Sequence, residues 1–205
     1  MTKLEYNDGV FINCPFDLDF KPIFDAITFT VFDCGFIARC TKEEQDASQI
    51  RIEKIYTIIS NCRYGIHDIS RTELDVSTGF PRFNMPFELG IFLASKRFGN
   101  DEQRKKKCLI LEKTPYKYQQ FMSDISGQDI EAHENNPKKA VGIVRNWLRN
   151  ASRRRSTPGG YEIWRHYQIF IDDLPSMCKD LRLKQNELIF NDYTSLVTEW
   201  LKLQE

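Results

Sequence analysis

The chain has 205 residues, in which 29 Lys and Arg balance 29 Asp and Glu, so its formal net charge is zero. This length favours one main domain with an extension over two full-sized domains. A neutral chain has no general basic surface to gather phosphate backbones, so we do not expect nucleic acid as a partner. Hydrophobic residues make up 41% of the chain, which is enough for a folded core and argues against disorder.

The hydropathy pattern and the cysteines bear on the compartment. The chain has no run of about 18 apolar residues, and its first residues, MTKLEYNDG, lack the apolar stretch of a signal peptide. We therefore expect a cytoplasmic protein with no membrane association. No two cysteines form a CxxC pair, so we expect free thiols, with neither a disulfide framework nor a metal site. The six are Cys14, Cys34, Cys40, Cys62, Cys108 and Cys178.

Short apolar runs alternate with amphipathic stretches along the first part of the chain. The apolar runs predict strands over residues 9–14, 36–40, 63–68 and 107–112. Between them, apolar side chains recur at helical spacing and predict helices over 20–34, 50–62 and 86–98. Residues 70–83 lack any sustained period and are expected to form a long loop. Such alternation implies a parallel sheet with helices on both faces.

The remaining residues complete this domain and add an extension. A helix over 116–125, a weak edge strand over 128–132 and a helix over 137–150 are predicted next. Residues 1–151 are thus expected to form a flavodoxin-like doubly wound α/β domain with a parallel sheet of about five strands. Residues 152–160, SRRRSTPGG, form a linker or exposed loop.

Residues 161–205 have a helical pattern and form the predicted extension. Helices are expected over 161–183 and 192–203. About 45 residues are few for an independent core, so we expect them to pack on the α/β domain or on a second subunit. Trp164 and Trp200 should be buried in that contact, because each indole removes a large apolar area from water.

The candidate binding residues follow from the fold class. In an open parallel sheet the ligand crevice lies beyond the carboxyl ends of the strands. Polar and loop residues at that edge are Asn13, Pro15, Phe16 and Asp17 after the first strand, Asp68, Ser70 and Arg71 after the third, and Arg82, Asn84 and Glu88 around the next helix start. Two carboxylates, Asp68 and Glu88, are expected to face one crevice.

Two segments carry a resemblance to a known family. CRYGIHDIS at 62–70 and PRFNMPFELGIFLASKRFG at 81–99 resemble the core of the superfamily that joins TIR and TIR-like domains with nucleoside 2-deoxyribosyltransferases. In those folds a helix opening with an apolar residue, Glu, Leu and Gly follows the third strand, and FELG at 87–90 matches that opening. The resemblance covers roughly residues 9–150 and is nearest to prokaryotic TIR-like proteins of unassigned function.

The resemblance implies a function for these residues. Glu88 would sit against the ribose of a nucleotide or nucleoside and assist cleavage of its N-glycosidic bond, as nucleophile or as support for the charged sugar. Asp68 would hold the sugar hydroxyls, Asn84 and Ser70 would form neutral hydrogen bonds, and Arg82 or Arg71 would clamp phosphate. NAD or another nucleotide would be the substrate or ligand, with no further cofactor. The family also implies a homo-oligomer acting in antiviral defence or stress signalling.

Other interpretations of the same residues stay open. Glu88 could cap its helix as the third helical residue after Met85, and Asp68 could be an ordinary turn residue. His67 is expected to be structural. The crevice could also sense a nucleotide or hold a partner protein without turnover. In a third alternative the protein acts through the helices of its extension and the crevice is inert.

Overall fold

A five-stranded parallel sheet forms the centre of the computed structural model, which describes residues 3–44, 46–74, 79–154 and 156–204. The strand order is β2-β1-β3-β4-β5, and every neighbouring pair is parallel. The strands are β1 (Gly9–Asn13), β2 (Ile37–Arg39), β3 (Tyr64–Asp68), β4 (Lys107–Glu112) and β5 (Ile130–Ala132). The predicted doubly wound α/β fold is confirmed, including its weak edge strand.

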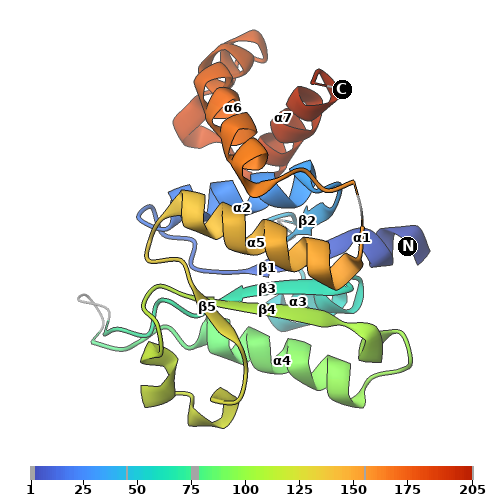
Figure 1. Ribbon diagram of the computed structural model, residues 1–205, viewed down its shortest axis with the longest axis vertical. Coiled ribbons are helices and arrows are strands. Elements are labelled where there is room, and N and C mark those ends of the chain that lie inside the picture. Colours follow the sequence, from blue (N-terminus) through green and yellow to red (C-terminus); the bar gives the residue numbers. More distant parts are fainter. Residues whose placement is uncertain (1–2, 45, 75–78, 155, 205) are drawn as a thin grey trace.

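Helices cover both faces of this sheet, as Figure 1 shows. On one face lie α2 (Lys21–Asp33) and α5 (Pro137–Ser152), and on the other α3 (Arg51–Ser60) and α4 (Asn84–Phe98). Both central strands are therefore buried along their whole length, which explains their continuous apolar runs. A short helix that the sequence pattern did not predict, α1 (Lys3–Asp8), precedes β1.

The segment between β4 and β5 differs from the prediction of a helix over 116–125. It forms two short 3₁₀ helices, η2 (Lys117–Gln120) and η3 (Ser123–Ile125). Tyr116 has a left-handed backbone with φ of 62°, which no α-helix continues through. Tyr118 is buried and packs with Leu89 and Ile110, so the apolar spacing that resembled a helix face serves tertiary packing instead.

The carboxyl-terminal extension packs on α2. It consists of α6 (Gly160–Asp180), a 3₁₀ turn η4 (Gln185–Glu187) and α7 (Phe190–Lys202), which lie above α2 in Figure 1. The ring centroids of Phe29 on α2 and Phe170 on α6 are 5.3 Å apart, and Phe170 and Trp200 are 5.9 Å apart. Trp200 is buried and Trp164 is half-buried. The extension and the sheet thus share one apolar core.

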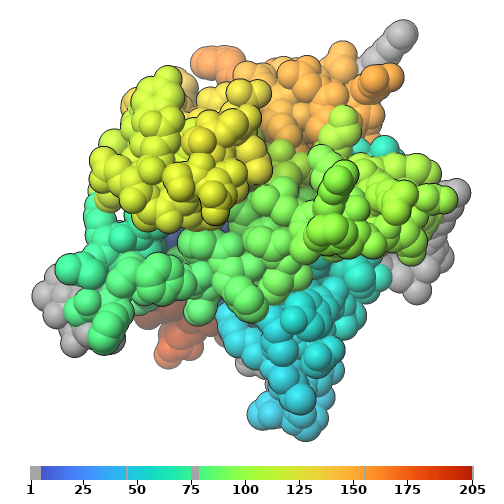
Figure 2. Space-filling view, turned by 90° about the horizontal axis from the view of Figure 1, so that it is seen from below, coloured from blue at the N-terminus to red at the C-terminus, as the bar shows by residue number. Residues whose placement is uncertain are grey.

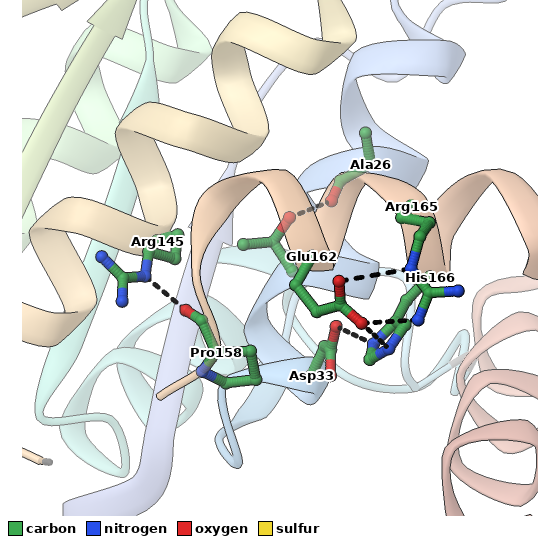
Figure 3. Close-up of polar contacts among 8 residues, drawn as sticks. Ala26, Asp33, Arg145, Pro158, Glu162, Arg165 and His166 are labelled. Atoms are coloured by element: carbon green, nitrogen blue, oxygen red, sulfur yellow. Dashed lines mark hydrogen bonds and ion pairs between the residues drawn. The ribbon is translucent and has the colours of Figure 1, made fainter. Parts of the chain in front are cut away.

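Polar contacts add to this docking, and Figure 3 shows them. His166 on α6 lies between two carboxylates: its Nδ1 is 3.0 Å from Asp33 Oδ2 on α2, and its Nε2 is 3.2 Å from Glu162 Oε1. The Arg145 guanidinium on α5 donates to the Pro158 carbonyl, which fixes the approach to α6. The extension is therefore tied to the α/β domain at both α2 and α5.

Two further expectations concern the cysteines and the membrane. All six cysteines are free, as the sequence predicts. Over the described ranges, no helix combines the length and the apolar character that crossing a bilayer requires.

The shared core can be tested by truncating Phe170, which is fully buried. Phe170→Ala should lower the free energy of unfolding by about 3 to 5 kcal/mol, because a large buried ring leaves a cavity. Its neighbour Ile169 is 37% exposed and provides the control, so Ile169→Ala should cost much less. Urea unfolding should remain a single transition in both variants. Separate early melting of residues 160–202 would contradict a common core.

Candidate functional site

The candidate site lies where β1 and β3 run side by side at the centre of the sheet. From its carboxyl end β1 leads to α2 on one face, whereas the chain after β3 leads to α4 on the other. Such a switch point leaves a crevice at the carboxyl ends of the two strands. Asn13, the last residue of β1, and Asp68, the last residue of β3, both lie at this edge.

Asn13 joins three elements at the edge. Its side-chain amide nitrogen donates to the Met85 carbonyl at 2.9 Å and lies 3.0 Å from His67 Nδ1. Both amide hydrogens are thereby engaged, so Asn13 positions the start of α4 and does not offer its amide N–H groups to a ligand. Burial lowers the pKa of His67 to about 3, which makes it a neutral structural histidine.

Asp68 is completely buried, and hydrogen bonds hold both of its oxygens. Oδ1 accepts from the Ser70 backbone N–H at 2.9 Å, and Oδ2 is 3.0 Å from His133 Nε2. The Asn135 backbone N–H donates to His133 Nδ1, so the ring proton lies on Nε2 and points to Asp68. The contact to Ser70 is the local turn that the sequence predicted as an alternative. The contact to His133, the residue after β5, was not predicted.

A serine, a histidine and an aspartate therefore meet here, yet they do not form a nucleophilic triad. Ser70 Oγ lies 3.2 Å from His133 Nε2, the same nitrogen that faces Asp68. In a triad the acid and the serine bind opposite nitrogens of the ring, so that the histidine can take the hydroxyl proton. This cluster instead fixes the Asp68 carboxylate in position.

Glu88 is a buried carboxylate in the first turns of α4. It is only 5% exposed, and among the described residues it has no hydrogen-bond or ion-pair partner. Burial raises the pKa of Glu88 to about 7, although the positive charge of Arg51 lowers it. Glu88 is thus close to half ionised at neutral pH.

The capping interpretation of Glu88 is wrong. The helix α4 begins at Asn84, so Glu88 is its fifth residue and not the third, and no side chain caps this helix. The prediction of a helix with Pro86 in its first turn that runs to about Phe98 is confirmed, because α4 spans Asn84–Phe98. Asn84, expected at the helix start, is the first residue of α4 and is exposed.

Cys14, the residue that follows β1, is buried. Burial raises the pKa of Cys14 well above its usual value, and the negative charges of Asp68 and Glu88 raise it further. Cys14 therefore remains a protonated thiol and no nucleophile. That Asp68 and Glu88 face one crevice stays a prediction. Figure 2 shows the face of the molecule that α3 and α4 cover, where α4 lies between α3 in cyan and the 113–128 segment in yellow.

Glu112 and His133 are site residues that the sequence analysis missed. Glu112 ends β4 and is 3% exposed; its Oε2 accepts from the Tyr118 backbone N–H at 3.0 Å. Its Oε1 is buried and has no partner within the part of the chain that the structure describes. Burial raises the pKa of Glu112, and the charge of Asp68 raises it further. Glu112 is the last residue of a predicted strand and His133 directly follows another, and this position at strand ends was the signal that could have found both residues.

Arg71 is already paired. Its guanidinium binds both oxygens of Asp17, with Nε to Oδ2 at 3.0 Å and Nη2 to Oδ1 at 2.5 Å. This ion pair crosses the switch point from the loop after β3 to the loop after β1. Partial burial raises the pKa of Asp17, but the bonds from Arg71 and the charge of Arg82 lower it to a value below the ordinary one. A phosphate on Arg71 would have to compete with Asp17.

The remaining predicted residues lie elsewhere. Pro15 and Phe16, together with Asp17, line a separate cavity beside the extension. No group of three His, Cys, Asp or Glu side chains within the described ranges could hold a metal ion. No family model, curated protein or solved structure matches this chain. Function therefore has to be inferred from the chemistry of the edge itself.

The unpartnered carboxylate makes a prediction about stability. Because the folded state raises the pKa of Glu88 from 4.5 to about 7, it binds the proton more tightly than the unfolded chain does. The free energy of unfolding should therefore fall as pH rises through this window. Glu88→Gln removes that dependence. As pH rises from about 4 to about 8, the free energy of unfolding of Glu88→Gln should increase by about 3 kcal/mol relative to that of the natural protein.

Urea unfolding across this pH range measures the effect. Glu53→Gln is the control, because Glu53 is exposed on α3 and should leave the pH dependence unchanged. Parallel stability curves for Glu88→Gln and the natural protein would contradict a buried, unpartnered carboxylate.

Proposed function

We propose that the protein cleaves the N-glycosidic bond of a nucleotide or nucleoside at the carboxyl edge of β1 and β3, with Glu88 facing the sugar. The observation that carries this proposal is the Glu88 carboxylate, which is buried and has no partner among the described residues. Burying a carboxylate in this way destabilises the fold, and groups with such perturbed pKa values gather at functional sites.

The chemistry of bond cleavage needs such a group. As the base leaves, positive charge develops on the sugar, and a nearby carboxylate either stabilises this charge or attacks the sugar carbon. The Glu88 side chain is only 5% exposed, so its negative charge acts more strongly than it would in bulk solvent. The ionised form of Glu88, favoured above about pH 7, is the form that can perform either role.

The other acidic residues suit the binding of a sugar. Asp68 is held in a fixed orientation by Ser70 and His133. Because Asp68 is completely buried, the surrounding loops would have to open before the second lone pairs of its oxygens could accept from sugar hydroxyl groups. Glu112 has one unpartnered oxygen for the same purpose. Two carboxyl groups in contrasting environments, one engaged and one unpartnered, are typical of sites that divide two roles between them.

The resemblance to TIR-like domains and deoxyribosyltransferases supports this proposal, because its HDIS and FELG segments contain Asp68 and Glu88. NAD or a related nucleotide is the proposed substrate, and the base is itself the leaving group, so no cofactor is required. By the same resemblance we propose a cytoplasmic homo-oligomer in antiviral defence or stress signalling. The same proposal includes binding to a partner protein. The base that is released is identified by the experiment described below.

A second candidate function is nucleotide sensing without turnover. The ion pair between Arg71 and Asp17 favours it, because a ligand phosphate would exchange with Asp17 and so change the contact between the loops after β1 and β3. Such an exchange is a switch in its own right and needs no bond cleavage.

Base release distinguishes these functions. Purified protein is incubated with NAD, AMP, adenosine and their counterparts with other bases, and released base is measured by chromatography. Glu88→Gln should lower the rate of release by at least about 100-fold and change ligand affinity much less, since the lost charge acts mainly in the transition state. Glu53→Gln should match the natural protein. Release by Glu88→Gln at the natural rate would refute the catalytic role, and binding without release by the natural protein would favour sensing.

The pH dependence of base release is a further prediction. If the ionised carboxylate is the active form, kcat/KM should rise as pH increases through about 7 and then level off, because burial raises the pKa of Glu88 to about 7. Initial rates in buffers of constant ionic strength provide the profile. A kcat/KM that falls through this range would instead indicate that a protonated group is required.

A further inference from the structure

A second cavity of about 340 Å³ lies between the α/β domain and the extension. Its walls come from the loop after β1, the first turns of α2, Lys42 after β2, and residues 186–193 before and within α7. Its size is at the lower end of the range for small-molecule sites. The site proposed around Glu88, at the carboxyl edge of β1 and β3, uses none of the residues from α2 and α7 that build this cavity.

The charges around this cavity leave one cation unpaired. Asp25 forms an ion pair with Lys21 at 2.5 Å, and Asp17 is bound by Arg71. Lys42 forms no ion pair with any described residue, and its Nζ lies 4.5 Å from the centre of the Phe16 ring. The cavity therefore offers a single free positive charge beside an aromatic face.

Two helices add to the preference for an anion. Both α2 and α7 begin at the cavity, and the first residues of each helix line it. The amino-terminal ends of both helices carry partial positive charge, which favours negative charge beside them. Asp17 and Asp192 already accept from the Phe20 and Ile189 N–H groups there. Each of the two helices is 13 residues long.

The apolar part of the cavity is built from aromatic rings. Phe16 meets Phe24 edge to face, with centroids 5.3 Å apart, and Phe24 and Phe190 are 5.9 Å apart. Phe24 and Phe190 are buried, so neighbouring side chains fix their orientation. Flat rings pack favourably against such walls, by offset stacking or edge-to-face contact.

We propose that this cavity binds a small aromatic monocarboxylate, with its ring against Phe16 and Phe190 and its carboxylate on Lys42. One free ammonium matches one negative charge, whereas a phosphate ester carries a charge of about −1.5 to −2 at neutral pH and leaves part of it unmatched. The proposal does not depend on the activity at Glu88. Because Asp17 lies in the cavity wall and binds Arg71, the bound carboxylate compound would also contact the loop after β1, which borders the site proposed around Glu88.

Fluorine NMR with para-trifluoromethyl benzoate as the probe tests this on the full chain. The benzoate should bind, and the uncharged para-trifluoromethyl benzamide should bind at least about tenfold more weakly, because it lacks the charge. Lys42→Met should weaken benzoate binding by about the same factor and leave the benzamide unchanged. Lys42 is exposed, so this variant should keep the fold.

Three controls keep the result specific. Lys179→Met removes an exposed lysine far along α6 and should leave benzoate binding unchanged. Glu88→Gln should also leave it unchanged, since the cavity is separate from the glycosidic edge. Phenyl phosphate should bind no more tightly than the benzoate. No benzoate binding at millimolar concentration, equal binding by Lys42→Met, loss of binding in Glu88→Gln, or tighter binding of phenyl phosphate would each overturn the proposal.

Discussion

The hydrogen bonds of the Asn13 amide are the interaction on which the candidate site depends. One nitrogen links the end of β1 to His67 on β3 and to the Met85 carbonyl in the first turn of α4. Glu88 follows Met85 by less than one helical turn, so this bond determines where its carboxylate meets the sheet. The helix has no side-chain cap of its own, which makes the contact from Asn13 the polar anchor of its start.

The rest of the molecule compensates for the unfavourable burial of Glu88. The sheet, α2 and the two helices of the extension form one continuous apolar core, in which Phe29, Phe170 and Trp200 pack together. A large core of this kind can tolerate one destabilising carboxylate, as proteins with strained functional sites do. The extension therefore has a physical role beyond any binding surface that it provides.

Much of the fold could be predicted from periodicity. The strands are short apolar runs closed by turn residues, and amphipathic spacing marks the helices, so the alternation of β1 to α5 follows from the sequence. The 113–129 segment could not be predicted in this way, because Tyr118 has a spacing that suits a helix but packs on Leu89 through tertiary contacts. A left-handed residue such as Tyr116 has no sequence signal.

The candidate site was predictable only in part. Asp68 and Glu88 could be selected because strand ends and helix starts meet at one edge of a parallel sheet. Their partners could not, since His133 follows a strand of only three residues and lies 65 positions after Asp68. The pairing of Arg71 with Asp17 likewise joins residues 54 positions apart, and no local pattern indicates which arginine is already engaged.

Carbon NMR of the Glu88 carboxyl group, assigned with Glu88→Gln, would test the central claim most directly. Because burial without a partner raises the pKa of Glu88, the carboxyl carbon should titrate with a midpoint near 7 in the protein alone. Adding a nucleotide whose sugar approaches the carboxylate should change that midpoint, since the ligand alters its solvation and charge. A midpoint near the ordinary value of 4.5 that no nucleotide changes would contradict both the buried carboxylate and the site proposed around it.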